Sequence, residues 1–200
     1  MSATCLRAGA TRTWARIAVA VVVGGVVVSG CAASQSQQAS CRHTHNSIPL
    51  LEAQAVPSAT LVPCILPLPG GWSYGGAQVR SGLARFWVNS DRAGTHAAEV
   101  RLTPTCDLGG ATQLPLARGG APVRRYQAPT ARQPPATVRY YVFPGGCVRY
   151  RFSFSQQTAP VLFEESDQFL GFTPRSVYVD GIRGMEGLTL CGAEAPPCPG

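Results

Sequence analysis

The sequence predicts an α+β fold: a small antiparallel β-sheet with one packed helix, stapled by disulfides. Three observations support this prediction. Apolar and polar residues alternate with strand periodicity in the middle of the chain, the period becomes helical after Gln157, and six cysteines follow the N-terminal segment. The 200 residues include 22 Gly and 17 Pro, a composition that favours short strands and turns over long helices.

Residues 1–30 are typical of a secretory signal peptide, which would precede the fold. Three arginines come before a purely apolar or small stretch of fourteen residues, 17–30. As a helix this stretch would be about 21 Å long, too short for a hydrocarbon core of about 30 Å. An uncleaved anchor that continues through Ala33 is the alternative.

Val28, Ser29, Gly30 and Cys31 resemble the lipobox of bacterial lipoprotein precursors. The resemblance implies cleavage before Cys31 and acylation of its sulfur and new N-terminus, with palmitate among the attached chains. The protein would then be a lipoprotein at the cell membrane, lipid-anchored on the extracytoplasmic face. An ordinary signal peptide that happens to contain a cysteine is the alternative.

The chain after the signal peptide divides into a short connection and one domain. Residues 31–40 comprise the lipidated N-terminus and the stretch "AASQSQQAS", whose small polar residues without periodicity predict a flexible tether. Residues 41–200 are predicted to form a single extracytoplasmic domain. If Cys41 is bridged into that domain, the tether has an r.m.s. span of about 15–18 Å, which keeps the domain close to the membrane.

Six cysteines are left once Cys5 leaves with the signal peptide and Cys31 takes the lipid. An even number on the oxidising side of a membrane predicts three disulfides, among fifteen possible pairings. We expect each cysteine to pair with its neighbour in sequence: Cys41 with Cys64, Cys106 with Cys147, and Cys191 with Cys198.

The first part of the domain mixes irregular and extended stretches. Residues 57–76 are rich in Pro and Gly, which predicts irregular packing around Trp72. Residues 83–88 and 97–102 alternate like strands, and the turn cluster "NSDRAGTH" between them predicts a hairpin.

The clearest hairpin spans residues 136–154. With Pro144-Gly145-Gly146 as a three-residue loop, the apolar residues gather on one face, and a shift by one residue would mix the faces. This register pairs Val142 with Val148, Tyr140 with Tyr150, Val138 with Phe152 and, on the other face, Tyr141 with Arg149 and Arg139 with Arg151.

A helix is predicted after Gln157. Thr158 can cap it, Pro160 suits its first turn, and Gly171 offers a stop. Residues 174–182 could be a final strand or a second helix, and we favour the strand.

The body of the chain also resembles a group of uncharacterised bacterial envelope proteins. The shared pattern is "GW…ARFW…SDRAG…FPGGCV-x-Y-x-F", which spans about half of this chain. The resemblance implies a place in the cell envelope and carries over no activity and no site residue.

The absence of lysine excludes several kinds of chemistry. Every one of the 17 basic residues is Arg, so a P-loop and Schiff-base or pyridoxal chemistry are ruled out. We expect no cofactor.

Candidate catalytic and metal-binding residues have simpler interpretations. His43 and His45 lie beside Cys41 at a spacing that could ligate a metal, but Cys41 serves better in a disulfide, so no metal site is expected. His96 follows Asp91 in a turn cluster whose composition turn chemistry explains, and no G-x-S-x-G elbow is present. The carboxylates of an early helix, Glu164, Glu165 and Asp167, fit dipole partners better than hydrolytic acids.

Charge distribution is the remaining signal. No acid lies between Asp107 and Glu164, where seven arginines and several tyrosines fall. Arg139, Arg149 and Arg151 are therefore anion-binding candidates, with phospholipid head groups or an anionic wall polymer as partner; no nucleic acid is expected. Like charges directly opposite on paired strands are unfavourable, so an anion would explain them, although we favour guanidinium groups that simply sit in water.

These observations predict a lipid-anchored extracytoplasmic envelope protein with a non-enzymatic binding or scaffolding domain of unknown ligand. The alternative is an envelope hydrolase that acts on a glycan or an ester, with His96 and Asp91 as its candidate residues.

Overall fold

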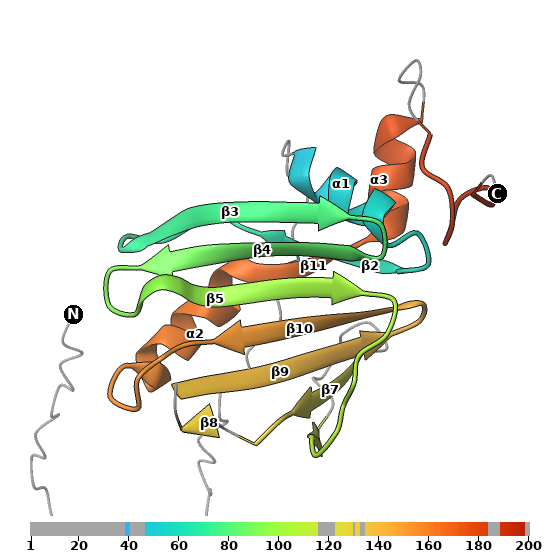
Figure 1. Ribbon diagram of the computed structural model, residues 1–200. Coiled ribbons are helices and arrows are strands. Elements are labelled where there is room, and N and C mark those ends of the chain that lie inside the picture. Colours follow the sequence, from blue (N-terminus) through green and yellow to red (C-terminus); the bar gives the residue numbers. More distant parts are fainter. Residues whose placement is uncertain are drawn as a thin grey trace, which may run out of the picture. The chain divides into compact units, whose positions relative to one another are not determined.

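The fold is α+β, as the sequence predicts. The computed structural model describes residues 39–40, 47–115, 123–129, 131–132, 135–183 and 189–198, which belong to one compact unit, Ser34–Gly200. A large antiparallel sheet is covered on one side by helices and a small second sheet (Figure 1). Among these residues, no helix combines the length and the hydropathy that crossing a membrane would require.

The large sheet has the strand order β3-β4-β5-β10-β9-β7-β6, and β8 pairs with the start of β9. Neighbouring strands are antiparallel throughout. The strands are β3 (Trp72–Arg80), β4 (Leu83–Ser90), β5 (Gly94–Thr103), β6 (Thr112–Leu114), β7 (Arg124–Gln127), β8 (Ala131–Arg132), β9 (Pro135–Phe143) and β10 (Gly146–Phe152).

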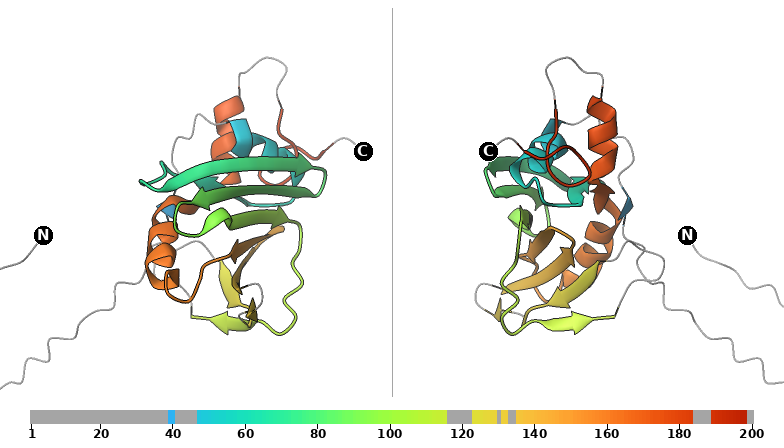
Figure 2. Two further views of the ribbon diagram at one scale, coloured as in Figure 1. Left: turned by 60° about the vertical axis from the view of Figure 1, so that its left-hand side comes forward. Right: turned by 90° about the vertical axis from the view of Figure 1, so that its right-hand side faces the viewer.

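The second layer contains the helices and the small sheet, whose order is β1-β11-β2. Figure 2 shows α2 and β1 on the same side of the large sheet. The elements are β1 (Ala39–Ser40), β2 (Leu61–Ile65), β11 (Leu170–Pro174), α1 (Ser47–Ala55), α2 (Ala159–Phe169) and α3 (Arg175–Ile182). The predicted helix is α2, and α1 and α3 are additions to the single helix that the sequence predicts.

Side-chain alternation divides the large sheet into a covered face and an open face. In β4, Phe86 and Val88 are buried while their neighbours are half-buried, and β5 and β10 repeat this pattern. Leu162 and Phe169 of α2 pack against the covered face. Burying one such aliphatic or aromatic side chain stabilises the fold by about 1.5–3 kcal/mol, so this face supplies the core.

The β9–β10 register differs from the predicted one by one residue. The loop has two residues, Pro144 and Gly145, so Gly146 pairs with Phe143 and Tyr150 pairs with Arg139. The predicted opposition of Arg139 and Arg151 is therefore wrong, and so is the pairing of Tyr140 with Tyr150. Tyrosine and arginine side chains have an apolar body and a polar end, so matching apolar character across the strands could not fix the register.

The Pro144–Gly145 turn is held against the loop before β2. Gly145 has φ +69°, and the Ser58 hydroxyl donates to its carbonyl oxygen at 2.6 Å. The Thr60 hydroxyl and backbone N–H donate to the Pro144 carbonyl oxygen at 2.9 and 3.3 Å. A Cβ at Gly145 would overlap the Ser58 carbonyl, so only glycine fits both the turn and its contact.

Three further expectations are corrected. Residues 57–76 contain β2 and the start of β3; the Pro63 of β2 is tolerated because β2 is an edge strand. Residues 174–182 do not form the favoured strand: Pro174 is the last residue of β11, and the helix α3 follows from Arg175 to Ile182. Ala39 and Ser40, which were predicted to belong to the tether, pair with β11 as the strand β1; the rest of the predicted tether lies outside the described residues.

Two of the predicted disulfides are confirmed. Cys106 pairs with Cys147 and Cys191 with Cys198, with Cα–Cα distances of 5.7 and 4.7 Å. Cys64 is also disulfide-bonded, and Cys41, its predicted partner, lies outside the described residues. The Cys106–Cys147 bond joins the segment that follows β5 to β10, the strand that pairs with β5 in the sheet.

A buried arginine connects the helices to the C-terminal loop. The Arg175 side chain is fully buried and donates to the carbonyl oxygens of Ala53, in α1, and Cys191, the latter at 2.6 Å. Burial lowers the pKa of its guanidinium. The two hydrogen bonds compensate part of the loss of solvation of this buried cation, whose Nε atom has no partner among the described residues.

We predict that replacing Gly145 by alanine lowers the free energy of unfolding more than replacing Gly82, another glycine of positive φ. Gly82, at φ +74°, has no atom near the place of a Cβ, whereas Gly145 meets the Ser58 backbone. We expect Gly82→Ala to lower the free energy of unfolding by about 1 kcal/mol through backbone strain alone. Gly145→Ala should cost about 2–4 kcal/mol because it also displaces the turn.

Urea unfolding of the two variants beside the wild type measures both effects. Equal losses for Gly145→Ala and Gly82→Ala would contradict the importance given to the turn contact.

Candidate functional site

Three arginines lie side by side on the open face of the large sheet. They are far apart in the sequence and become neighbours through strand pairing. Arg85 of β4 lies directly opposite Arg101 of β5, and Arg101 lies directly opposite Arg149 of β10. We call these three residues the arginine row. Directly opposite residues of paired strands have Cβ atoms about 4.5–5.5 Å apart, so three like charges lie side by side.

The row continues into aromatic residues toward the far edge. Arg149 lies opposite Tyr140 of β9, and Tyr140 opposite Tyr126 of β7. All five side chains are half-buried. Figure 1 looks onto this face, and no helix is drawn over it.

One acid partly neutralises the face. Glu99, the only acidic residue of β4, β5 and β10, accepts a hydrogen bond from Arg149 at 3.4 Å and lies 3.7 Å from Arg101. Arg151, opposite Glu99 in the sheet, donates to the Ser153 hydroxyl at 3.0 Å. Four arginines and one glutamate leave this part of the face strongly positive.

An indole ring borders the arginine row. Trp87 stacks on the imidazole of His96 with ring centroids 4.8 Å apart, and the Arg85 guanidinium lies over the Trp87 ring at 5.8 Å. A Cβ at Gly75 or Gly76 would overlap the indole, so these two glycines at the β3 bulge leave it room. The face thus offers flat aromatic surface beside cationic groups.

The three predicted anion-binding residues do not share a face. Arg149 and Arg151 lie on the open face, while Arg139 lies on the covered face beside α2. Its guanidinium pairs with Asp167 at 3.4 Å and stands over the Phe163 ring at 4.5 Å. The two arginines that complete the row, Arg85 and Arg101, were missed because the β5–β10 pairing joins residues about fifty positions apart.

The candidates for hydrolysis are not assembled. Among the described residues, no hydrogen bond joins the His96 imidazole to a carboxylate or a serine hydroxyl, and the His96 backbone N–H donates to the Asn89 side chain at 3.0 Å. His96 has φ +54°, so it belongs to the irregular end of the β4–β5 hairpin. The predicted turn chemistry is the better explanation.

The acidic residues of α2 do not form a common site, because Glu165 and Asp167 contact different partners. Glu165 accepts from the Trp72 indole N–H at 2.7 Å and pairs with Arg92, and the bonds from Arg92 and Trp72 lower the pKa of its carboxyl. Asp167 pairs with Arg139, and Glu164 is exposed. Glu165 therefore ties α2 to β3 and to the β4–β5 turn.

Other predicted site residues lie outside the described part of the chain. These are the lipidation candidate Cys31, the disulfide candidate Cys41, and the two histidines considered as metal ligands, His43 and His45. Within the described ranges, no group of His, Cys, Asp and Glu is placed to hold a metal ion.

Comparisons with protein-family models, curated proteins and solved structures find no match for this chain.

A buried carboxyl in α1 has an unusual environment. Glu52 is 1% exposed, and neither carboxyl oxygen has a hydrogen-bond partner. Burial raises its pKa well above the ordinary value of 4.5, because the fold disfavours the charged form of the carboxyl. Beside it lies a cavity of about 20 Å³, large enough for one water molecule, which Tyr74 and Cys64 also line.

Glu52 predicts that stability falls as pH rises. The pKa of Glu52 is higher in the folded than in the unfolded state. Its neutral form therefore contributes fully to the free energy of unfolding below about pH 4.5, and this contribution is lost as pH rises through the folded-state pKa. Glu52→Gln cannot ionise, so its free energy of unfolding should rise relative to that of the wild type progressively as the pH increases above about 4.5. Exposed Glu164→Gln is the matched control.

Urea unfolding at several pH values tests this. A stability difference between Glu52→Gln and wild type that does not change with pH would show that Glu52 does not titrate as its burial requires.

Proposed function

We propose that the protein is a lipid-anchored extracytoplasmic binding protein of a bacterial cell envelope, and that its open sheet face binds an anionic polymer. The observation that carries the proposal is the arginine row, Arg85, Arg101 and Arg149. The function is binding and not catalysis. We do not propose the alternative hydrolase, because the His96 ring stacks on Trp87 and, within the described part of the chain, forms no hydrogen bond with a carboxylate or a serine hydroxyl.

Charge supports an anionic partner. Like charges directly opposite on neighbouring strands destabilise a sheet, and Glu99 can compensate only part of this repulsion. Arginine forks pair with phosphate and carboxylate oxygens in bidentate geometry, which an ammonium cannot do. A bound anion would therefore supply the neutralisation that the free domain lacks.

The spacing favours a polymer over a single small anion. Neighbouring strands lie about 4.8 Å apart, so the row presents three guanidinium groups over about 10 Å. Tyr140 and Tyr126 extend the same row with ring surface and hydroxyl groups. A chain that carries repeated acidic groups could follow the row across the sheet.

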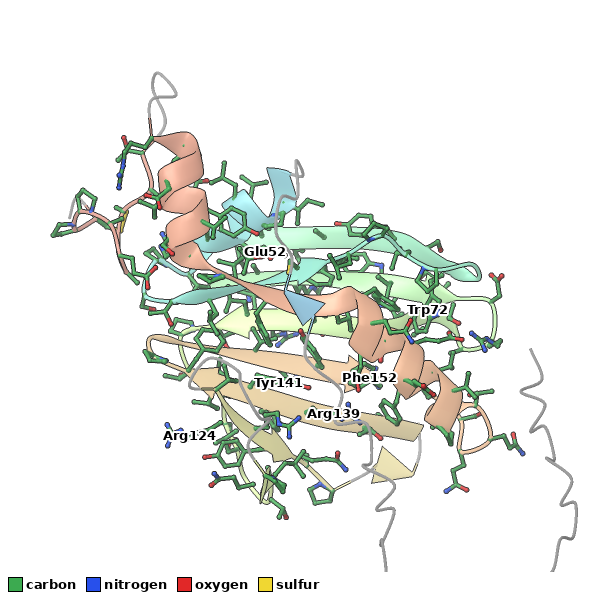
Figure 3. All side chains as sticks on the ribbon, turned by 180° about the vertical axis from the view of Figure 1, so that it is seen from behind. Glu52, Trp72, Arg124, Arg139, Tyr141 and Phe152 are labelled. Carbon is green, nitrogen blue, oxygen red and sulfur yellow. A yellow bond between two sulfur atoms is a disulfide. The ribbon has the colours of Figure 1, made fainter. Side chains whose placement is uncertain are left out.

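The membrane that would hold the proposed anchor is a second anionic surface, and the vesicle measurement below distinguishes it from a polymer. β1, the first described strand, pairs with β11 in the layer on the covered side of the large sheet; Figure 3 shows this side. The arginine row lies on the opposite face of that sheet.

The lipid anchor rests on the residues Val28-Ser29-Gly30-Cys31 and has its own test. We expect palmitate to label the wild-type protein, and Cys31→Ser to abolish both labelling and removal of residues 1–30. Labelling that persists in Cys31→Ser would favour an uncleaved anchor instead.

The polymer proposal predicts that each arginine of the row contributes separately. An arginine close to an anionic surface contributes about 1 kcal/mol, so Arg85→Gln, Arg101→Gln or Arg149→Gln should each weaken binding about fivefold. The binding should also weaken with salt. Titration calorimetry of the Ser34–Gly200 unit with soluble polyphosphate and with polygalacturonate measures the affinities.

Arg183→Gln is the matched control, because it removes the same charge from an exposed position at the end of α3. A loss for Arg183→Gln equal to that for Arg101→Gln would show that net charge, and not the row, drives binding. Sedimentation with phosphatidylglycerol vesicles tests the membrane as partner: tighter binding there than to both polymers would overturn the choice of a polymer.

A further inference from the structure

The covered face of the large sheet contains a polar cavity that is separate from the arginine row. Its volume is about 170 Å³, and it lies at the β6-β7-β9 end of the sheet beside α2 and β11. Arg139 and Tyr141, labelled in Figure 3, are seen there from the side of α2. The polar lining residues are Arg125, Gln127, Arg139, Tyr141, Tyr150 and Asp167.

Sheet register explains why these side chains meet. Gln127, Arg139 and Tyr150 lie directly opposite one another across β7, β9 and β10. Arg125 and Tyr141 form the adjacent row on the same face. The lining residues come from six elements of the chain, β6, β7, β9, β10, α2 and β11, so the cavity is formed by the fold and not by one loop.

The Tyr150 hydroxyl is the clearest sign of a missing partner. Tyr150 is 2% exposed, and its hydroxyl makes no hydrogen bond. A buried polar group without a partner is unfavourable, and native structures rarely keep one without a reason. Burial above all, and then Tyr141 and Asp167, raise the pKa of this hydroxyl, so it remains a donor at neutral pH.

Hydrogen-bond donors exceed acceptors around the cavity. The Arg125 guanidinium donates to the Pro115 carbonyl oxygen at 2.5 Å, and that of Arg139 to Asp167 at 3.4 Å. The Nε atoms of both arginines are buried without a partner. Two arginines against one aspartate leave one positive charge in excess, so the site complements an anion with several acceptor oxygens.

Two leucines limit what else can bind. Leu114 of β6 and Leu170 of β11 line the same cavity, so one part of a ligand would meet apolar surface. A cavity of about 150 Å³ holds benzene, so this one suits a molecule of about six to nine non-hydrogen atoms.

We propose that this cavity is a binding site for a small monocarboxylic acid with an apolar or aromatic body. The carboxylate would accept hydrogen bonds from the Tyr150 hydroxyl and from Arg125 and Arg139, and the body would lie against Leu114 and Leu170. This proposal is independent of the polymer site, since the two sets of side chains lie on opposite faces of the sheet.

The test uses benzoate and benzamide, which have nearly the same shape and differ in charge. We expect the Ser34–Gly200 unit to bind benzoate at least tenfold more tightly than benzamide in titrations followed by NMR. Tyr150→Phe removes only the unpartnered hydroxyl and should weaken benzoate binding about tenfold. The same change should leave the urea midpoint equal or higher, because no hydrogen bond of the fold is lost.

Two controls make the result specific. Tyr140 and Arg101 lie on the open face of the sheet, away from the cavity. Tyr140→Phe and Arg101→Gln should therefore leave the benzoate affinity unchanged. Equal binding of benzoate and benzamide, no binding of either, or unchanged benzoate affinity in Tyr150→Phe would each overturn the proposal. A lower urea midpoint for Tyr150→Phe would show that the hydroxyl supports the fold instead.

Discussion

The two-residue turn at Pro144 and Gly145 decides on which face of the sheet each side chain of β9 and β10 lies. Because side chains alternate with a period of two, one more residue in the turn would exchange the faces of one strand relative to the other. The Ser58 and Thr60 contacts and the need for glycine at position 145 fix this length. The core and both candidate sites depend on the resulting register.

The register gives the two faces different chemistry. On the covered face, Tyr150 and Arg139 are neighbours, and α2 closes over them with Phe163 and Asp167. On the open face, Arg149 aligns with Arg101 of β5. The same hairpin therefore supplies polar side chains to the inside of the domain and charged side chains to its open face. β1 lies on the inner side, where it pairs with β11.

Local patterns predicted much of the fold. Alternation located the strands that became β4, β5, β9 and β10, helical spacing located α2, and neighbour pairing gave the disulfides Cys106–Cys147 and Cys191–Cys198. Tertiary contacts decided the rest. The hairpin register depended on contacts with Ser58, more than eighty residues away, and the arginine row depended on the pairing of β5 with β10. Arg85 precedes Phe86, which is buried, in the alternating stretch that forms β4. This alternation was the local sign that Arg85 lies on the open face.

The central claim is that an anionic polymer binds across β4, β5 and β10. The most direct measurement is the change in backbone amide chemical shifts of the Ser34–Gly200 unit during titration with soluble polyphosphate. The account predicts that the largest changes cluster around Arg85, Arg101 and Arg149. Changes confined to α3 and residues 189–198, or spread evenly over the surface, would contradict it.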